Sequence, residues 1–511
     1  IVKIRRWSSS TERGDISELF ALSESDPVWA KVTSNTDNCL GSDCQYFDKC
    51  YLIDARRKAQ AADIVVVNHH LMFADMALRE DGFAELLPAA DAFIIDEAHQ
   101  LPDVASNFFG ISMSSNQILE LARDAETEYL AEINEGQTFR NCTDELQKMI
   151  RDLRLDFGTR IGRGAWHEVS NKSEIKAGIE EVTEALNVLQ KQLQPLAERS
   201  KGLDSCLRRC IALQEKFSVL TDKTAIDHIH WYETHKLSFS IHLTPLSIAS
   251  SFQSQMKAMN AAWIFTSATL AVADSFEMFQ QQLGIEESET AKFESPFDFP
   301  NQALFYVPKG LPPPNEPGYT AAVVDYALPV LEASEGRAFM LFTSHRALAE
   351  AAELLHDKLD YLLLIQGDEP RDILLERFRK AGNAILLGTS SFWEGVDVRG
   401  EALSCVIIDK LPFASPGDPV LQGRIDAMRK QGLNPFISYQ LPHSVITLKQ
   451  GAGRLIRDVN DYGVLVVMDP RLLGKSYGHL FLNSLPDMAR TRDINEVVKF
   501  FEKLKQVAVT E

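Results

Sequence analysis

Short apolar runs, each followed by a small group of polar residues, recur along this chain and constrain its fold more than any other feature. The runs are rich in Val, Ile and Leu, which is typical of strands buried on both faces of a parallel sheet. Helical patterns lie between them, so the sequence predicts two open α/β sheets whose ligands bind beyond the carboxyl ends of the strands. The runs are 64–67, 93–95 and 263–265 in the first part of the chain, and 338–342, 361–365, 384–387, 406–408 and 464–467 in the last part.

The stretch from Leu101 to about Thr244 has a different pattern. Its apolar residues step by alternate fours and threes, which predicts the seam of a long helix. We therefore expect an antiparallel helical insertion that interrupts the first sheet and returns through an alternating, strand-like stretch, His230–Leu243. The residues of the seam are Ile175, Ile179, Val182, Leu186, Leu189, Leu193 and Leu196.

Composition narrows the class of protein. Hydrophobic residues make up 45% and charged residues 24%, which is ordinary for a folded chain and excludes a mainly disordered or fibrous one. No apolar run approaches the ~18–20 residues that span a bilayer. The net charge of −20 argues against a surface that is basic everywhere, although a groove can still be locally basic. Seven cysteines in 511 residues fit a reducing compartment, so we expect a cytoplasmic protein.

The tetrapeptide Asp96-Glu97-Ala98-His99 comes directly after one of the apolar runs. An aspartate at that place can hold Mg²⁺, often through water, and a glutamate can polarise an attacking water. For the tetrapeptide alone, an acidic loop that caps the next helix is an equally good interpretation.

Further polar clusters follow in a fixed order. The last of them contains Arg454 and Arg457, which would share one face of a helix. Two aligned guanidinium groups suit the charge of a transferring γ-phosphoryl group, although a solvated face or a row of salt bridges is the alternative for the pair alone. The clusters are Thr266–Thr269, Thr343–His345, Thr389–Asp397 and Gln450–Arg457.

In this order, the motifs DEAH, SAT, FWEGVD and QGAGRLIR resemble those of superfamily-two helicases, specifically the XPD/DinG group of iron–sulphur DNA helicases. The resemblance extends over almost the whole chain. It implies an α/β fold of two RecA-like parallel-sheet lobes, with an iron–sulphur loop domain and a helical, arch-like insertion in the first lobe. The implied boundaries are 1–60 for a partial iron–sulphur domain, 61–101 and 245–300 for the first lobe, 102–244 for the insertion and 301–511 for the second lobe.

The resemblance also implies roles for residues of the first lobe. Asp96 would hold Mg²⁺, and Glu97 would act as the base towards the hydrolytic water. His99, together with Ser267 and Thr269, would couple the state of the nucleotide to movement between the lobes. Hydrolysis would then require closure of the two lobes on ATP.

Residues of the second lobe would complete the site. By the same resemblance, Gln450, Arg454 and Arg457 would reach the γ-phosphate from across the cleft. The other implied residues are Glu394, Gly395, Asp397 and Gly453 near the nucleotide, and Thr343, Ser344, Thr389 and Trp393 near the DNA strand or in coupling.

Three cysteines, Cys39, Cys44 and Cys50, lie within one short segment. Thiolates at such spacing suit zinc or an iron–sulphur cluster, and a reduced, ligand-free loop is also open. The resemblance selects a [4Fe–4S] cluster, whose fourth cysteine is missing from this sequence. The remaining cysteines, among them Cys206 and Cys210, are interpreted as core residues.

A phosphate-binding loop, GxxxxGK[ST], is expected ahead of Asp96 in this family, and the sequence has none. Gly474-Lys475-Ser476 lacks the first glycine of that motif and follows the arginine cluster. With the missing cysteine and the absence of an initial Met, this leads us to expect the larger carboxyl-terminal part of a helicase, or a truncated relative. We expect that residues 1–511 alone neither hydrolyse ATP nor hold a stable cluster.

The predicted function is that of a monomeric, ATP-driven motor that moves 5′→3′ on single-stranded and forked DNA, in the bacterial cytoplasm. Binding should be mainly to the DNA backbone and strongly dependent on salt. The resemblance further implies a role in replication or repair and contact with the chi subunit of the replicative polymerase clamp loader. The alternative is a non-catalytic DNA- or protein-binding subunit with a degenerate helicase core. A fused nuclease is disfavoured, because the sequence shows no added acidic constellation.

Overall fold

The computed structural model divides the chain into two compact units, each assembled from separate segments. Unit 1 comprises Ile1–Phe93, Gln100–Trp263 and Pro416–Ala427, and unit 2 comprises Ile94–His99, Ile264–Ser415 and Met428–Glu511. The boundaries implied by the sequence run along different lines and stay predictions. The described residues are 1–19, 22, 26, 28–35, 38–80, 86–133, 137–222, 227–271, 275–356, 358–389, 392, 398 and 400–510.

Unit 2 contains a seven-stranded sheet in the order β13-β7-β12-β11-β8-β10-β9, and its neighbouring strands pair in parallel. Each of the five apolar runs in the last part of the chain supplies one strand, so the prediction of a parallel α/β sheet is confirmed here. β7 and β13 were not predicted. The strands are β7 (Ala303–Tyr306), β8 (Ala338–Leu341), β9 (Leu363–Ile365), β10 (Ile385–Gly388), β11 (Cys405–Ile408), β12 (Gly463–Val467) and β13 (Ala489–Thr491).

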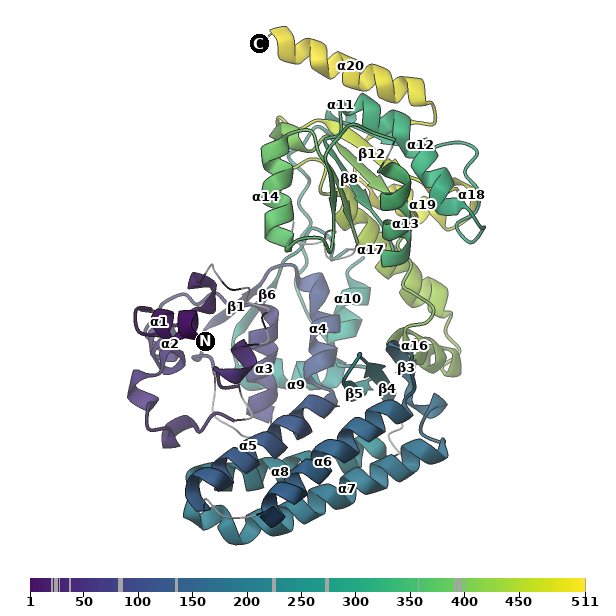
Figure 1. The fold of residues 1–511 in the computed structure, drawn as a ribbon. Coiled ribbons are helices and arrows are strands. Elements are labelled where there is room, and N and C mark those ends of the chain that lie inside the picture. Colours follow the sequence, from purple (N-terminus) through teal and green to yellow (C-terminus); the bar gives the residue numbers. More distant parts are fainter. Residues whose placement is uncertain are drawn as a thin grey trace. The chain divides into compact units, whose positions relative to one another are not determined.

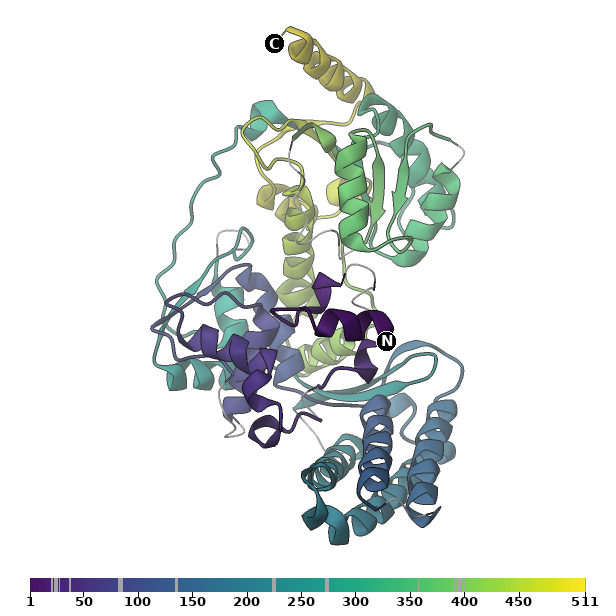
Figure 2. The ribbon, with the colours of Figure 1, turned by 60° about the vertical axis from the view of Figure 1, so that its left-hand side comes forward.

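This sheet is buried on both faces, because successive residues of each strand point to opposite sides. In β8, Phe339 and Leu341 join one apolar core, and Ala338 and Met340 join the other. Helices lie on either side of the green strands in Figure 2. The helices of unit 2 are α10 (Glu277–Leu283), α11 (Phe299–Gln302), α12 (Tyr319–Ala333), α13 (His345–Leu355), α14 (Arg371–Ala381), α17 (Leu441–Ala452), α18 (Arg471–Gly474), α19 (Gly478–Ser484) and α20 (Ile494–Thr510).

Unit 1 contains a group of long helices that pack side by side (Figure 1). The seam predicted from the sequence is buried at Ile175, Val182, Leu186, Leu189 and Leu193, and it faces the other helices of the same apolar core. The helix ends before Pro195, and a 3₁₀ segment leads into the next one. The long helices are α5 (Ser115–Ile133), α6 (Gln137–Asp156), α7 (Ser173–Leu193) and α8 (Lys201–Thr221).

A four-stranded antiparallel sheet in the order β2-β5-β4-β3 packs against these helices. The strand-like stretch of the sequence forms the hairpin of β4 and β5. The strands are β2 (Ile111–Ser114), β3 (Gly162–Ala165), β4 (His228–Thr234) and β5 (Phe239–Pro245). The other helices of this unit are α1 (Val2–Ser8), α2 (Tyr51–Gln60), α3 (His69–Glu80), α4 (Leu101–Phe108) and α9 (Ala249–Met259), together with most of α16 (Pro419–Lys430).

The first predicted sheet is represented by two strands, β1 (Ala92–Ile95) and β6 (Ala262–Phe265). They run in the same direction, since Ala262 N donates to Asp91 O and Thr266 N to Ile95 O at 2.9 and 2.8 Å. The predicted strand at 64–67 was wrong: this segment joins no sheet, and Ile64 and Val66 are 84% and 92% exposed. An apolar run forms a strand only where a neighbour takes its backbone hydrogen bonds. No helix of the described residues is long and apolar enough to cross a bilayer.

Candidate functional site

The DEAH tetrapeptide forms a tight turn at the end of β1. Asp96 Oδ1 accepts hydrogen bonds from Glu97 N at 2.9 Å and from the hydroxyl of Thr266 at 3.1 Å. Glu97 has a φ of 47°, in the left-handed region that a non-glycine residue enters at a cost of about 1–3 kcal/mol. Such strain persists where the surrounding contacts over-determine the conformation, and here the backbone N–H of Ala98 donates to Thr266 O at 3.0 Å.

His99 lies at the centre of a hydrogen-bonded chain. Its Nδ1 lies 2.8 Å from the hydroxyl of Ser267, which in turn donates to Glu97 Oε2 at 3.3 Å. Its Nε2 contacts Nε2 of Gln450, a residue 351 positions further along the sequence. The His99 side chain is 8% exposed, whereas that of Glu97 is 53% exposed. The buried imidazole therefore connects an accessible carboxylate to the last motif of the chain.

One arrangement of protons satisfies all of these contacts. The amide nitrogen of Gln450 is a donor only, so the Nε2 of His99 that it contacts must be the acceptor nitrogen of a neutral imidazole. Nδ1 then carries the proton and donates it to Ser267, whose own proton goes to Glu97. The hydroxyl of Ser267 also accepts from the backbone N–H of Thr269 at 3.1 Å. Six predicted residues are thus brought into two adjoining loops and one helix end: Asp96, Glu97, His99, Ser267, Thr269 and Gln450.

The arginine cluster is placed differently from the prediction. α17 ends at Ala452, with Gly453 as its C-cap, so Arg454 and Arg457 follow the helix in an irregular segment and the helical expectation was wrong. The carboxylate of Asp461 accepts from the backbone N–H groups of Arg457 and Asp458, at 2.7 and 2.8 Å. These are the donors that a continued helix would use, and an acidic side chain that binds them competes with the helix. Arg454 is buried, with 8% of its surface exposed.

The predicted DNA residues at the strand ends of unit 2 bond to their own framework. Thr389 donates from its backbone N and its hydroxyl to Gln366 Oε1, at 2.6 and 3.1 Å. Ser344 caps α13 by accepting from Ala347 N at 3.2 Å. The predicted Trp393, Glu394, Gly395 and Asp397 lie outside the described residues.

Sequence reasoning missed a buried acidic residue, Asp409, at the end of β11. Its carboxylate accepts from the backbone N and the hydroxyl of Thr343, at 3.0 and 3.4 Å, and lies 3.1 Å from Lys410 Nζ. Burial raises the pKa of this carboxyl to about 6, although the ion pair with Lys410 acts in the opposite direction. An aspartate that directly follows an apolar run was the available signal.

A second buried carboxylate, that of Asp469, follows β12. It binds Arg471 through Nε and Nη2 and accepts from the backbone N of Leu411 at 2.9 Å. The hydroxyl of Tyr319 bridges the two strand ends, since it contacts the carbonyl oxygens of Asp409 and Met468 at 2.7 and 2.6 Å. Together these groups fix the loops at the carboxyl edge of the sheet.

The three clustered cysteines occupy a segment of short 3₁₀ turns before α2. Cys39 is exposed, and Cys44 and Cys50 are half-buried. Among the described residues, no group of three or more His, Cys, Asp or Glu side chains is arranged to hold a metal. The donors suit iron, but three thiolates are one fewer than a [4Fe–4S] cluster needs, and they are not assembled into a site.

The other cysteines, and the half-buried histidines His230 and His242 of the antiparallel sheet, are structural. Burial raises the pKa of Cys142 to about 11 and those of Cys206 and Cys210 to about 12, and it also raises that of Cys405. His230 stacks on Trp166 and His242 on Trp231, at ring centroid distances of 4.9 and 3.9 Å. Burial lowers the pKa of both histidines to about 4. These side chains pack as neutral rings.

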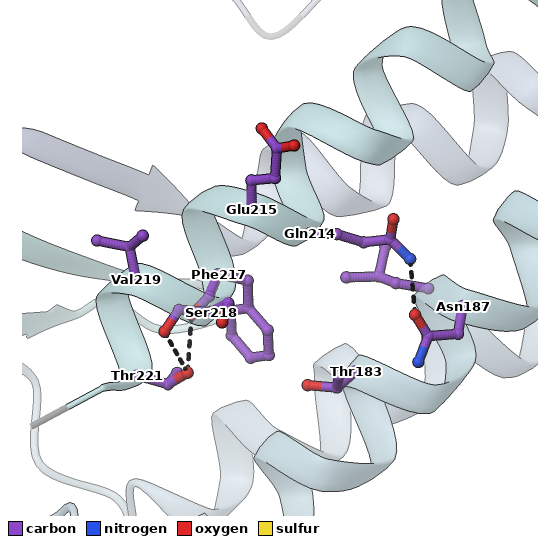
Figure 3. Close-up of a pocket in the computed structure, with 9 residues that line it drawn as sticks. Thr183, Asn187, Gln214, Glu215, Phe217, Ser218, Val219 and Thr221 are labelled. Carbon is purple, nitrogen blue, oxygen red and sulfur yellow. Dashed lines mark hydrogen bonds between the residues drawn. The ribbon is translucent and has the colours of Figure 1, made fainter.

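A groove of about 520 Å³ lies between α7 and α8 (Figure 3). Gln214 Nε2 donates to Asn187 Oδ1 at 3.0 Å at one end, and Thr221 bonds to the backbone of its own helix at the other. None of its lining residues is among the predicted site residues, so the groove adds nothing to the candidate site.

Comparison with known proteins places the chain among helicases. A family model described as the helicase C-terminal domain matches residues 327–488. The ATP-dependent DNA helicase YoaA of Haemophilus influenzae is 44% identical over 501 residues, which are 98% of this chain and 78% of that protein. YoaA of Escherichia coli is 45% identical over 500 residues, covering 98% and 79%. A solved XPD helicase shares the α/β fold, with a TM-score of 0.55, 17% identity and coverage of 86% of this chain and 75% of that one.

Proposed function

Because this chain belongs to the XPD/DinG family of helicases, with YoaA-like relatives, we propose that it works as an ATP-dependent DNA helicase. Its motor would move 5′→3′ along single-stranded DNA and open forks during replication or repair. The observation that carries the proposal is the hydrogen-bonded chain from Glu97 through Ser267 and His99 to Gln450. It connects an exposed carboxylate to the motif that ends in Arg454 and Arg457.

In this proposal Asp96 and Glu97 act on the nucleotide from one side. Both described contacts of the Asp96 carboxylate fall on Oδ1, which leaves Oδ2 to hold a water of a Mg–ATP complex. Mg²⁺ would offset the charge of the phosphates when the nucleotide is bound. Glu97 would orient the attacking water and take its proton. Its carboxylate is exposed, so a water molecule can reach it.

Gln450, Arg454 and Arg457 would act on the γ-phosphate from the other side. Guanidinium groups stabilise the charge that spreads over the transferring phosphoryl group. Gln450 also contacts His99, which bonds to Ser267. Departure of the phosphate would therefore change the hydrogen bonds of Ser267 and Thr269. Gly453, Glu394, Gly395 and Asp397 would line the nucleotide site, and Thr343, Ser344, Thr389 and Trp393 would lie near DNA.

We further propose an organisation into two RecA-like lobes, with the helices α5–α8 as an arch-like insertion. Cys39, Cys44 and Cys50 would supply three of the four thiolates of a [4Fe–4S] cluster, and contact with a clamp-loader subunit remains a prediction. Residues 1–511 contain no GxxxxGK[ST] ahead of Asp96. We therefore expect no ATP turnover from these residues alone, and the alternative of a non-catalytic DNA-binding subunit is decided by the same assay.

The decisive test measures ATP hydrolysis and fork unwinding by the protein that carries this chain, beside the isolated chain 1–511. Glu97→Gln should abolish the DNA-stimulated ATP turnover, because the amide cannot accept the proton of water. Glu335→Gln is the matched control, since Glu335 has a similar positive φ of 56° but pairs with Lys505 and Arg337 instead. Steady turnover by 1–511 that depends on Glu97 would refute the expected inactivity of the isolated chain. Absence of turnover from the whole protein would favour the binding subunit.

A further inference from the structure

Most of one helix belongs to a different unit from the residues that precede and follow it in the sequence. Residues Pro416–Ala427, which include most of α16, belong to unit 1, whereas the segments before and after them belong to unit 2. The chain therefore passes from unit 2 into unit 1 and returns within a dozen residues. A helix with both flanks in another unit is a mechanical connection between the two.

α16 is fixed to α4 by a half-buried arginine. Arg424 Nη1 lies 3.2 Å from Asp103 Oδ1, and its Nη2 donates to the hydroxyl of Ser106 at 2.9 Å. That hydroxyl donates its own proton to Pro102 O at 2.7 Å, so it is available only as an acceptor to Arg424. The Arg424 side chain is 14% exposed, and charged hydrogen bonds in such surroundings are stronger than at an open surface.

The position of α4 gives this contact its significance. α4 begins at Leu101, two residues after His99 of the DEAH motif. A force on Arg424 is thus applied to the helix that continues directly from the proposed ATP site.

A glycine sets the distance between α16 and the antiparallel sheet. A Cβ added at Gly423 would lie 2.7 and 2.8 Å from Cγ2 and Cγ1 of Ile229 in β4, closer than van der Waals contact allows. Ile229 is buried, and its β-branched side chain is restricted at χ1. The helix backbone therefore rests on β4 at this position, which Figure 1 shows beside α16.

A third contact fixes the amino-terminal end of α16. Asp418 Oδ1 accepts from the backbone N of Val420 and Leu421, both at 2.9 Å, while its Oδ2 lies 3.4 Å from Arg163 of β3. The guanidinium of Arg163 also lies over the ring of Trp231, 5.1 Å from its centroid. Three separate contacts, on α4, β4 and β3, thus hold one short helix.

We infer that α16 transmits movement from unit 2 to α4 and to the antiparallel sheet that packs against the long helices, with Arg424 and Gly423 as positioning residues. The helix is docked on three elements, so displacement of its flanks must either move those elements or break the contacts. That this transmitted movement serves DNA unwinding rests on the proposed helicase function. The docking itself does not.

Hydrogen exchange on the chain 1–511 tests the docking. Alanine favours an isolated helix over glycine, so Gly423→Ala in an undocked α16 should slow its amide exchange by about fivefold. In the docked helix the new methyl group strikes Ile229, and exchange over 419–427 should instead become faster. The double variant Gly423→Ala with Ile229→Ala should restore protection, because the smaller side chain makes room. Gln422→Ala is the control, since Gln422 is exposed and its side chain bonds to Asp426 of the same helix.

Exchange in α6 and α7, which belong to the same unit as Gly423 and Ile229, shows whether that unit remains folded in each variant. Slower exchange of α16 in Gly423→Ala, or a failure of Ile229→Ala to restore its protection, would overturn the docking and with it the inference.

The transmission is tested by the number of base pairs unwound per ATP hydrolysed, in the protein that carries this chain. Arg424→Gln and Asp103→Asn should lower that ratio by about tenfold while DNA-stimulated ATP turnover persists, because a lost charged hydrogen bond frees the helix. Gln422→Ala should change neither quantity. A merely structural role would lower ATP turnover and unwinding in parallel, and that result would overturn the proposal.

The two proposals fail in different ways. If the wild-type protein does not unwind DNA, the helicase function fails and the transmission role with it, while the exchange experiment still decides the docking. If it unwinds DNA and the Arg424 variants keep the wild-type ratio, only the transmission is wrong.

Discussion

The residue on which the proposed chemistry turns is His99, because its two ring nitrogens serve different partners. Nε2 must remain unprotonated to accept from Gln450, while Nδ1 donates to Ser267. In a protonated imidazole Nε2 would also carry a proton and would face the donating amide nitrogen of Gln450, so this contact of the chain would break. The contact is therefore sensitive to whatever stabilises the imidazolium form.

In the variant Gln450→Glu, the proposed ATP turnover should be lost at a higher pH than in the wild type as the pH is lowered. A carboxylate beside His99 stabilises the charged imidazolium and raises its pKa, by about one unit or more. The acid limb of the turnover–pH profile should move upward by a similar amount in the protein that carries this chain. Gln431→Glu, at an exposed position after α16, is the control. An unchanged acid limb would mean that the neutral tautomer is not required.

The buried carboxyl of Asp409 makes the folding stability of the protein decrease as the pH rises. Its folded-state pKa of about 6 lies above its ordinary value of 3.8, so the stability it contributes is present below pH 4 and is lost as pH rises through 6. Asp409→Asn removes this loss, which is at most about 3 kcal/mol. The variant should therefore gain stability relative to wild type between pH 4 and about 7. Denaturant unfolding at several pH values measures it, with the exposed Asp325→Asn as control.

At the scale of the element, the carboxyl end of α17 depends on one buried carboxylate. Asp461 accepts from the backbone N–H groups of Arg457, Asp458 and Gly400. It thereby stops the helix and holds the segment of the two arginines.

Asp461→Ala should destabilise the protein by about 1–3 kcal/mol, because it leaves part-buried backbone donors without their acceptor. Denaturant unfolding gives the free energy, and hydrogen exchange over 453–461 should become faster. Asp458→Ala is the control, since its side chain accepts from the nearby Asn460 N, two residues along the same loop. Equal effects of the two substitutions would contradict the role of Asp461.

Among the strands and helices, some were predictable from the sequence and others were not. The apolar runs of unit 2 predicted five strands because burial on both faces demands Val, Ile and Leu in short stretches. The run at 64–67 has the same composition and forms no strand, since composition does not reveal a neighbour to pair with. The spacing of Arg454 and Arg457 suggested a helix, but the competing carboxylate of Asp461 is close only in the folded chain.

The candidate site was predictable to a similar extent. DEAH and TSAT lie at adjoining strand ends, and the order of motifs pointed to their proximity. Asp409 and Asp469 were missed, because a single aspartate after a strand does not indicate whether it is buried or what it binds.

At the scale of the whole molecule, the two units have separate apolar cores. Leu186 is buried in the core of the long helices and their sheet, and Phe339 in the core of the parallel sheet. Each unit therefore has its own source of stability, since burial of apolar surface is the main favourable term in folding.

Leu186→Ala should lower the unfolding midpoint of unit 1 while leaving unit 2 nearly unchanged. The cavity and the lost burial cost about 2–5 kcal/mol. Calorimetry with hydrogen exchange resolved along the chain would assign each transition. Phe339→Ala is the reciprocal variant, with the effect confined to unit 2. A single transition displaced equally by both substitutions would show that the units unfold together.

The close approach at Gly423 also has an evolutionary consequence. A side chain at that position crowds Ile229 of β4, so it should disturb the docking of α16 less where residue 229 is smaller. Among related sequences, a side chain at the position of Gly423 should therefore accompany a smaller residue at the position of Ile229, and a comparison of those sequences checks this. The residues at positions 423 and 229 should therefore change together in size.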